Sequence, residues 1–313
     1  MKLTKLLVIP LTVLASVFPS ACTSEDDPKP VVSTSTTTFR LGMDTQTRSA
    51  QPINFSLYEV KMYLYEERLN EESNSLAYQY KTELEITQAD LVVVDDLTPG
   101  NKYKAVFLAI PKEQLPSLPI YKTIDVVTPY ESAEVQYISE DTNDIENHIY
   151  RSIVNFTATT ADSEHYTVLT RQNGAVEVRI LNTPGVSKAE LHLKGHTTML
   201  IQDGTGGQVK TVGQPTEELV NTIEDVSKVS DIRVRINILP QEDISDDTGN
   251  SNYLKLTMDD GTEKVYNIKS DHDKIPVYPN QVTWLTIGNN AGNFDVSFSG
   301  YINVEDDKWD GWK

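Results

Sequence analysis

The residues best able to do chemistry in this chain are histidines, one cysteine and paired acids, and their spacing matches no catalytic pattern. The single cysteine, Cys22, lies near the N-terminus, which excludes a cysteine nucleophile in a folded core and a thiolate metal cluster. His192 and His196 have the four-residue spacing of a helical metal pair. However, Lys194-Gly195 between them indicates the end of a strand, where that spacing does not bring the two rings together.

The acidic and glycine-rich segments are equally uninformative about catalysis. No Gly-x-Ser-x-Gly motif is present, and the glycine-rich segment 203–211 lacks the spacing of a phosphate-binding loop. Asp246-Asp247 and Asp259-Asp260 do not follow the register of an EF-hand loop. Carboxylate pairs of the glycosidase type have many candidates, and nothing singles out two of them. We therefore predict no enzymatic activity, no cofactor and no metal.

Charge and composition limit the possible partners. Acidic residues outnumber basic ones 46 to 27 in the 313 residues, for a formal net charge of −19. Phosphate backbones would repel such a chain, so nucleic-acid binding is excluded. With 38% hydrophobic and 23% charged residues the composition is globular, and the length suits about two domains.

The first residues have the pattern of a lipoprotein signal peptide over 1–21. Lys2 and Lys5 precede an apolar run, 6–18, that is too short to span a bilayer. The small residues before Cys22 resemble a bacterial lipobox, whose cysteine carries the lipid. The acidic segment 24–27 is similar to the surface-export signal of Bacteroidales lipoproteins. The alternatives are a plain secretory leader and a solvated acidic tether, and we expect a flexible tether over 22–37 in either case.

The rest of the chain is typical of β structure. Short alternating apolar segments recur, and turn pairs separate them at Asn173-Gly174, Asp203-Gly204 and Asp260-Gly261. This pattern predicts an all-β protein of two antiparallel β-sandwich domains, 38–168 and 169–313. One or two short helices are also expected, the clearer one over Glu217–Val229, where Leu219, Ile223 and Val226 have helical spacing.

Two segments near the ends alternate strictly between apolar and polar residues. In the C-terminal one the apolar positions form a single face about 36 Å long in an extended strand. They are Phe294, Val296, Phe298, Gly300, Ile302 and Val304. In the N-terminal one they are Phe39, Leu41 and Met43, and Arg48 follows in a polar loop where a trypsin-like protease could cut. The alternatives are an ordinary closing strand and an ordinary loop arginine.

Together these residues resemble the fimbrillin superfamily, the type V pilins of Bacteroidales. The resemblance rests on the segment around Cys22, on the strand Thr36–Met43 with Arg48 after it, on 60–65 and 97–103, and on 166–180. It implies two transthyretin-like β-sandwiches on an outer-membrane lipoprotein exposed at the cell surface.

The resemblance also implies assembly with other fimbrial subunits. Cleavage after Arg48 would remove the first strand, with Phe39, Leu41 and Met43. The C-terminal strand of another subunit would then fill the groove through a second set of apolar residues. That set is Phe294, Val296, Phe298, Ile302 and Val304.

Two other functions remain open. An anchor or tip subunit of the same kind would stay unprocessed and could bind a host or bacterial surface ligand. A surface glycan-binding lipoprotein of a polysaccharide-uptake system would need exposed aromatic residues, for which Trp284, Trp309 and Trp312 are the candidates.

Overall fold

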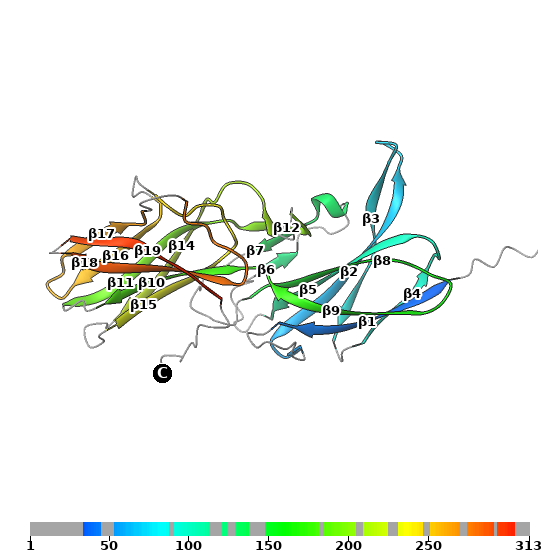
Figure 1. The fold of residues 1–313 in the computed structure, drawn as a ribbon, viewed down its shortest axis with the longest axis horizontal. Coiled ribbons are helices and arrows are strands. Elements are labelled where there is room, and N and C mark those ends of the chain that lie inside the picture. The colour runs from blue at the N-terminus through cyan, green and yellow to red at the C-terminus, as the bar shows by residue number, and fades with distance from the viewer. Residues whose placement is uncertain are drawn as a thin grey trace, which may run out of the picture. The chain divides into compact units, whose positions relative to one another are not determined.

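The regular secondary structure of the described residues is almost entirely β-strand (Figure 1). The computed structural model describes residues 34–44, 53–87, 91–112, 121–123, 129–137, 148–181, 185–204, 209–224, 231–246, 251–269, 274–290 and 293–303. Within these ranges the one helical element is a 3-10 turn, η1, over Tyr130–Ser132. No helix among them is long and apolar enough to cross a membrane. The all-β sandwich class predicted from the sequence is confirmed.

The N-terminal half contains a seven-stranded sheet in the order β3-β2-β5-β8-β9-β1-β4. Its strands are β3 (Ser75–Ile86), β2 (Tyr58–Asn70), β5 (Lys102–Pro111), β8 (Tyr150–Thr157), β9 (Ser163–Arg171), β1 (Ser35–Met43) and β4 (Val92–Leu97). β8 and β9 pair only at Tyr150↔Arg171 and Arg151↔Thr170. Side chains of β1, β4 and β9 pack on those of β2, β5 and β8 in one core. The β9-β1-β4 part and the β3-β2-β5-β8 part therefore act as the two layers of a sandwich.

Strand β5 is apolar without interruption over 105–111, and the two faces of the strand explain this run. Tyr103, Ala105 and Phe107 face the core that contains β1, whereas Val106 and Leu108 face a second cluster with η1. That second cluster also holds a four-stranded sheet in the order β13-β12-β7-β6. Its strands are β13 (Val209–Thr211), β12 (Thr198–Asp203), β7 (Glu134–Tyr137) and β6 (Tyr121–Thr123). A strand covered on both faces needs apolar residues at every position.

The C-terminal half is a sandwich of two four-stranded sheets. One has the order β15-β10-β18-β19 and the other β14-β11-β16-β17. The strands are β15 (Asp231–Ile238), β10 (Gly174–Leu181), β18 (Gln281–Asn290), β19 (Asn293–Asn303), β14 (Glu217–Glu224), β11 (Val186–Gly195), β16 (Tyr253–Met258) and β17 (Glu263–Asn267). Their inner faces share one core. In β10, for example, Val176, Val178 and Ile180 point inward at a period of two.

The helix predicted over Glu217–Val229 is wrong. Residues 217–224 form strand β14, which pairs antiparallel with β11. Leu219 and Ile223 are four apart, and that separation also places them on one face of a strand. Asn221 between them lies on the same buried face, where its amide donates to the carbonyl of Arg235 at 2.5 Å. This polar inward residue hid the period-two pattern.

The hairpin predicted at Asn173-Gly174 is also wrong, because β9 and β10 belong to different sheets. Both residues are buried, and a Cβ on Gly174 would lie 2.3 Å from the carbonyl oxygen of Tyr278. The glycine therefore permits a close approach of two backbones. β9 runs without a break from Ser163 to Arg171, and β10 opens the next sheet at Gly174. The domain bounds 38–168 and 169–313 stay a prediction.

Candidate functional site

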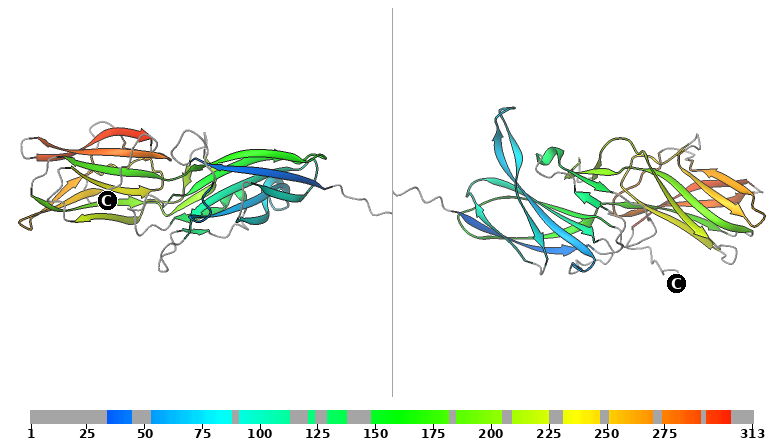
Figure 2. Two further views of the ribbon diagram at one scale, coloured as in Figure 1. Left: turned by 90° about the horizontal axis from the view of Figure 1, so that it is seen from below. Right: turned by 180° about the vertical axis from the view of Figure 1, so that it is seen from behind.

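The first candidate element, β1, lies inside its sheet and not at the edge. It runs parallel to β9 over Thr37–Met43 and antiparallel to β4 over Ser35–Phe39. Figure 2 shows β1 in blue beside β9 in green. The turn-rich sequence predicts antiparallel sheets, whereas this pair and the pair β10–β18 are parallel. The backbone of β1 is thus hydrogen-bonded on both sides along its first half.

The apolar side chains of β1 lie in the centre of the N-terminal core. Phe39 is fully buried, and Leu41 and Met43 are 4% and 1% exposed. The Phe39 ring meets Phe107 and Phe156 edge to face, with centroids 5.2 and 5.5 Å apart. The three side chains predicted for the first strand therefore share one buried cluster. Removing them would open a large apolar groove.

Polar contacts along β1 are few and local to its neighbours. The Thr36 hydroxyl donates to Asp95 at 2.9 Å, and the hydroxyls of Thr37 and Ser163 lie 2.9 Å apart. Arg40 pairs with Glu164 where both side chains are more than half exposed, so the pair contributes little to stability. Apolar burial and backbone pairing hold β1 in place.

β4 covers only half of β1, because its register ends at Val92, opposite Phe39. β9 continues to pair through Leu169, opposite Met43. Without β1, a strip of backbone groups on β9 and a shorter strip on β4 would lose their partners. Unpaired backbone groups beside an apolar groove are the elements of strand addition.

The second candidate element, β19, is the outer strand of its sheet. It pairs antiparallel with β18 from Asn290↔Asn293 to Gln281↔Asn303 (Figure 1). The register shifts between Trp284 and Leu285, which lie opposite Gly300 and Phe298. Gly300 has φ of +136°, a conformation that favours glycine. Ser299 is the extra residue of a β-bulge at this point.

The bulge lies within the segment whose apolar face alternation predicts as continuous. Val296 and Phe298 lie opposite Ile287 and Leu285, two residues of the sandwich core. Beyond the bulge, Ile302 lies opposite Val282, which belongs to a cluster on the other face of β18. An inserted residue reverses the alternation of a strand, so the backbone register changes inside this segment, and the single apolar face over Phe294–Val304 stays a prediction.

Several predicted site residues lie outside the described residues. They are Cys22, Arg48, Val304, Trp309 and Trp312. The remaining tryptophan, Trp284, is half-buried, and the Arg179 guanidinium carbon lies 3.5 Å from its ring centroid. That ring therefore does not offer an open platform for a sugar.

His192 stacks on Tyr253 with centroids 4.3 Å apart. Among the described residues no group of three His, Cys, Asp or Glu side chains could hold a metal.

Sequence reasoning missed a buried carboxylate, Glu66 on β2. It accepts hydrogen bonds from Tyr103 Oη at 2.9 Å, Asn101 Nδ2 at 2.7 Å and Arg68 Nε at 2.7 Å. Burial raises the pKa of the Glu66 carboxyl, but these hydrogen bonds and Lys81 outweigh burial and leave the pKa below its ordinary value. The Tyr103 hydroxyl also accepts from the amide of Thr98 at 3.0 Å. The carboxylate thus fixes the turn between β4 and β5.

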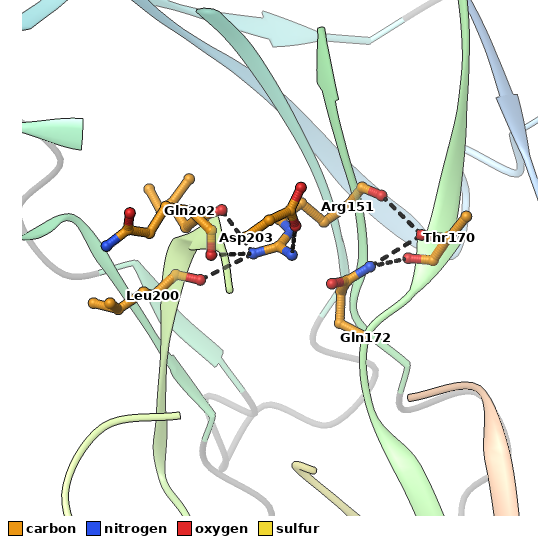
Figure 3. A network of polar contacts seen from close by, with 7 residues as sticks. Arg151, Thr170, Gln172, Leu200, Gln202 and Asp203 are labelled. Carbon is orange, nitrogen blue, oxygen red and sulfur yellow. Dashed lines mark hydrogen bonds and ion pairs between the residues drawn. The ribbon is translucent and has the colours of Figure 1, made fainter. Parts of the chain in front are cut away.

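A second buried charge, Arg151 on β8, was missed as well. Its Nη1 lies 3.0, 2.7 and 3.1 Å from the carbonyl oxygens of Leu200, Ile201 and Gln202 on β12 (Figure 3). Its other terminal nitrogen pairs with Asp203. A single arginine in an apolar strand gives no sign of a distant partner, because its ligands are backbone groups. Arg151 connects β8 of the seven-stranded sheet to β12.

Several solved structures are similar to this chain at low sequence identity. No family model matches the chain, and no curated protein matches it. A solved structure of a candidate polysaccharide-binding protein from Bacteroides thetaiotaomicron has 11% identity and a TM-score of 0.48, covering 82% of this chain and 92% of that one. A candidate cell adhesion protein from Bacteroides ovatus has 10% identity and a TM-score of 0.45, covering 86% and 96%. The fimbrial anchor protein Mfa2 from Porphyromonas gingivalis has 11% identity and a TM-score of 0.41, covering 84% and 95%.

Proposed function

We propose that this protein is a structural subunit of a cell-surface fimbria that assembles by exchange of β-strands. The observation that supports this most directly is the place of β1, which lies between β9 and β4 and fills the core with Phe39, Leu41 and Met43. In the described part of this sheet, the edge strand β4 alone lies beyond it. Cleavage at Arg48 would separate β1 from the rest of the chain and so allow it to leave.

In this proposal the strand that replaces β1 is the C-terminal segment of another subunit. Its apolar residues are Phe294, Val296, Phe298, Ile302 and Val304. Among the described strands β19 pairs with β18 alone, so it has fewer backbone pairings to lose than an inner strand. Burying five such side chains contributes on the order of 10 kcal/mol before the cost of ordering. That free energy would suit a durable fibre.

Before assembly, a lipid on Cys22 would hold the subunit at the outer membrane. The proposal gives the chain a structural role and no catalytic one. A subunit that keeps its lipid and its first strand would serve as an anchor or tip, and the processing state therefore decides between the two roles.

The processing test is N-terminal sequencing of the protein taken from cells. A start at Ser49 is expected for the wild type, and Arg48→Gln should abolish it together with polymers that persist in cold detergent. Arg40→Gln is the matched control, because Arg40 lies in the middle of β1, and it should leave processing unchanged. A protein that always starts at Cys22 would exclude the polymerising subunit.

The exchange test uses a synthetic peptide of residues 294–304. It should bind the protein after limited trypsin and not before, because only cleavage frees the groove. A peptide with Val296→Asp and Phe298→Asp should not bind, since charges would enter an apolar groove. Equal binding to the cleaved and uncleaved protein would contradict strand exchange.

A further inference from the structure

Three aromatic side chains contact the ring of Phe39 in the middle of β1. The ring meets Phe107 and Phe156 edge to face, and it stacks on the imidazole of His165 with centroids 5.4 Å apart. His165 lies directly opposite Phe39 on β9, and its ring centroid is 5.3 Å from that of Phe156. We name Phe107, Phe156 and His165 the ring cluster. Aromatic pairs attract beyond the area that they bury, so this position favours an aromatic residue over an aliphatic one.

The other inward positions of β1 differ on the two sides of Phe39. Before it, Thr37 is buried and its hydroxyl lies 2.9 Å from that of Ser163 on β9. After it, Leu41 and Met43 lie in the apolar core. A strand that takes the place of β1 therefore needs three features in order. These are a residue that does not cover the Ser163 hydroxyl with an apolar group, an aromatic residue, and two apolar residues.

The C-terminal segment has residues of these kinds in the same order. Gly292, Phe294, Val296 and Phe298 stand at alternate positions there. We infer that the C-terminal strand of another copy enters in one register, in which Phe294 packs against the ring cluster. Val296 and Phe298 then take the positions of the last two inward residues of β1, and the remaining two apolar residues of the C-terminal set lie beyond its end. This register rests on the proposed strand exchange and names the residue that the groove selects.

Phe298, the other phenylalanine of this segment, gives a poorer fit at the ring cluster. With Phe298 there, Gly300 would come next, at the position of Leu41, and would leave a cavity in the core. Val296 would come before it and would cover a hydroxyl of β9 with an apolar side chain. Both losses are absent when Phe294 packs against the ring cluster, so that register is favoured.

The outer side of the strand does not oppose this register. Asp295 would take the position of Arg40, which lies opposite Tyr166 on β9. There it would lie near Glu164, which pairs with Arg40 in the uncut protein. The side chains of Arg40 and Glu164 are both more than half exposed, so screening by water and salt keeps the cost of two like charges small.

Disulfide trapping between two variants tests the register in assembled subunits. Because Arg40 lies opposite Tyr166, the residue that replaces Arg40 should form a disulfide with a cysteine at position 166. Protein with Tyr166→Cys is mixed with protein that carries Asp295→Cys, and both are treated with limited trypsin, since cleavage at Arg48 separates Cys22 from the rest of each chain. Under mild oxidation we expect a disulfide that joins position 166 of one copy to position 295 of the other.

Ser299→Cys in place of Asp295→Cys is the matched control. Ser299 would lie opposite Tyr166 if Phe298 packed against the ring cluster, and otherwise it should give no link, because cysteines with Cα atoms more than about 7 Å apart cannot be bridged. A link from Ser299→Cys and none from Asp295→Cys would overturn the register and leave strand exchange standing, and polymers without either link would do the same. Loss of both links together with loss of polymers would contradict the strand exchange itself.

The selection of an aromatic residue has its own measurement. A synthetic peptide of residues 290–304 should bind the protein after limited trypsin, and Phe294→Leu should weaken that binding about tenfold, because it removes contacts with three rings. Phe298→Leu is the matched control and should weaken binding less than about threefold, since β1 has an aliphatic residue, Met43, at that position. Equal effects of the two substitutions would overturn selection by the ring cluster.

Discussion

Glu66 is a single residue on which a whole turn depends, and its hydrogen bonds give a pH-dependent prediction. The folded protein lowers the pKa of this carboxyl, so the ionised form is favoured in the folded state. The resulting stabilisation is present above the ordinary pKa and is lost as the pH falls through the lower folded pKa. Glu66→Gln should reduce the free energy of unfolding by about 2 kcal/mol at neutral pH.

Urea denaturation at several pH values checks this prediction. The difference between Glu66→Gln and the wild type should shrink below about pH 4, where the unfolded-state carboxyl becomes protonated. Glu67→Gln is the control, because its pair with Lys102 lies at the surface, and its effect should be under about 0.5 kcal/mol. A difference independent of pH would argue against the charge of Glu66 as the cause.

Arg151 gives the second prediction at this scale. Arg151→Met keeps much of the side-chain volume but removes the donor from three backbone carbonyls of β12. The free energy of unfolding should fall by about 3 kcal/mol, since each unsatisfied buried group costs about 1 kcal/mol or more. Asp203→Asn should cost less than about 1 kcal/mol, because the Asp203 side chain is 44% exposed. Equal effects in chemical denaturation would mean that the ion pair, and not the carbonyl contacts, fixes Arg151.

At the scale of the element, β1 should contribute strongly to the stability of the uncut protein. Phe39→Ala should reduce the free energy of unfolding by about 4 kcal/mol, because it removes a fully buried ring that contacts two other rings. Arg40→Ala on the exposed face of the same strand should change it by less than about 0.5 kcal/mol. Thermal or urea unfolding measures both. A small effect of Phe39→Ala would show that β1 contributes little to the core.

The element scale also shows what alternation can and cannot predict. The strands β1, β5 and β10 follow directly from runs of alternating or continuous apolar residues, because burial on one or two faces dictates their composition. Asn221 hid β14, since an inward polar residue looks like an outward one until its partner is known. The parallel pairing of β1 with β9 joins residues 126 positions apart at Thr37 and Ser163, and local pattern contains no such information.

In the candidate site too, local alternation predicted some residues, whereas those that depend on distant partners were missed. The three side chains of β1 were predicted from alternation and are buried together. The register shift in β19 was not predicted, because a one-residue insertion leaves no mark in composition. Glu66 and Arg151 were missed because their partners are far along the chain or are backbone groups.

At the scale of the whole molecule, net charge makes a prediction about association. The whole chain has a formal charge of −19, and cleavage after Arg48 removes five basic and four acidic residues and leaves −20, so cleaved copies repel one another. If cleaved subunits assemble, the rate should rise between about 0.05 and 0.5 M salt, because screening shortens the range of this repulsion. Light scattering after limited trypsin measures the rate.

The orientation of β1 would give such a fibre a direction. A strand that takes its place and keeps its hydrogen bonds must run parallel to β9 and antiparallel to β4, so it can enter in one sense only. Every junction would then be head-to-tail, and a row of such junctions forms an open fibre when the rotation between neighbours does not close a ring. One terminus of the row would always have a vacant groove and the other an undonated tail. Growth would have a polarity, and a subunit unable to offer one of these two ends would stop it.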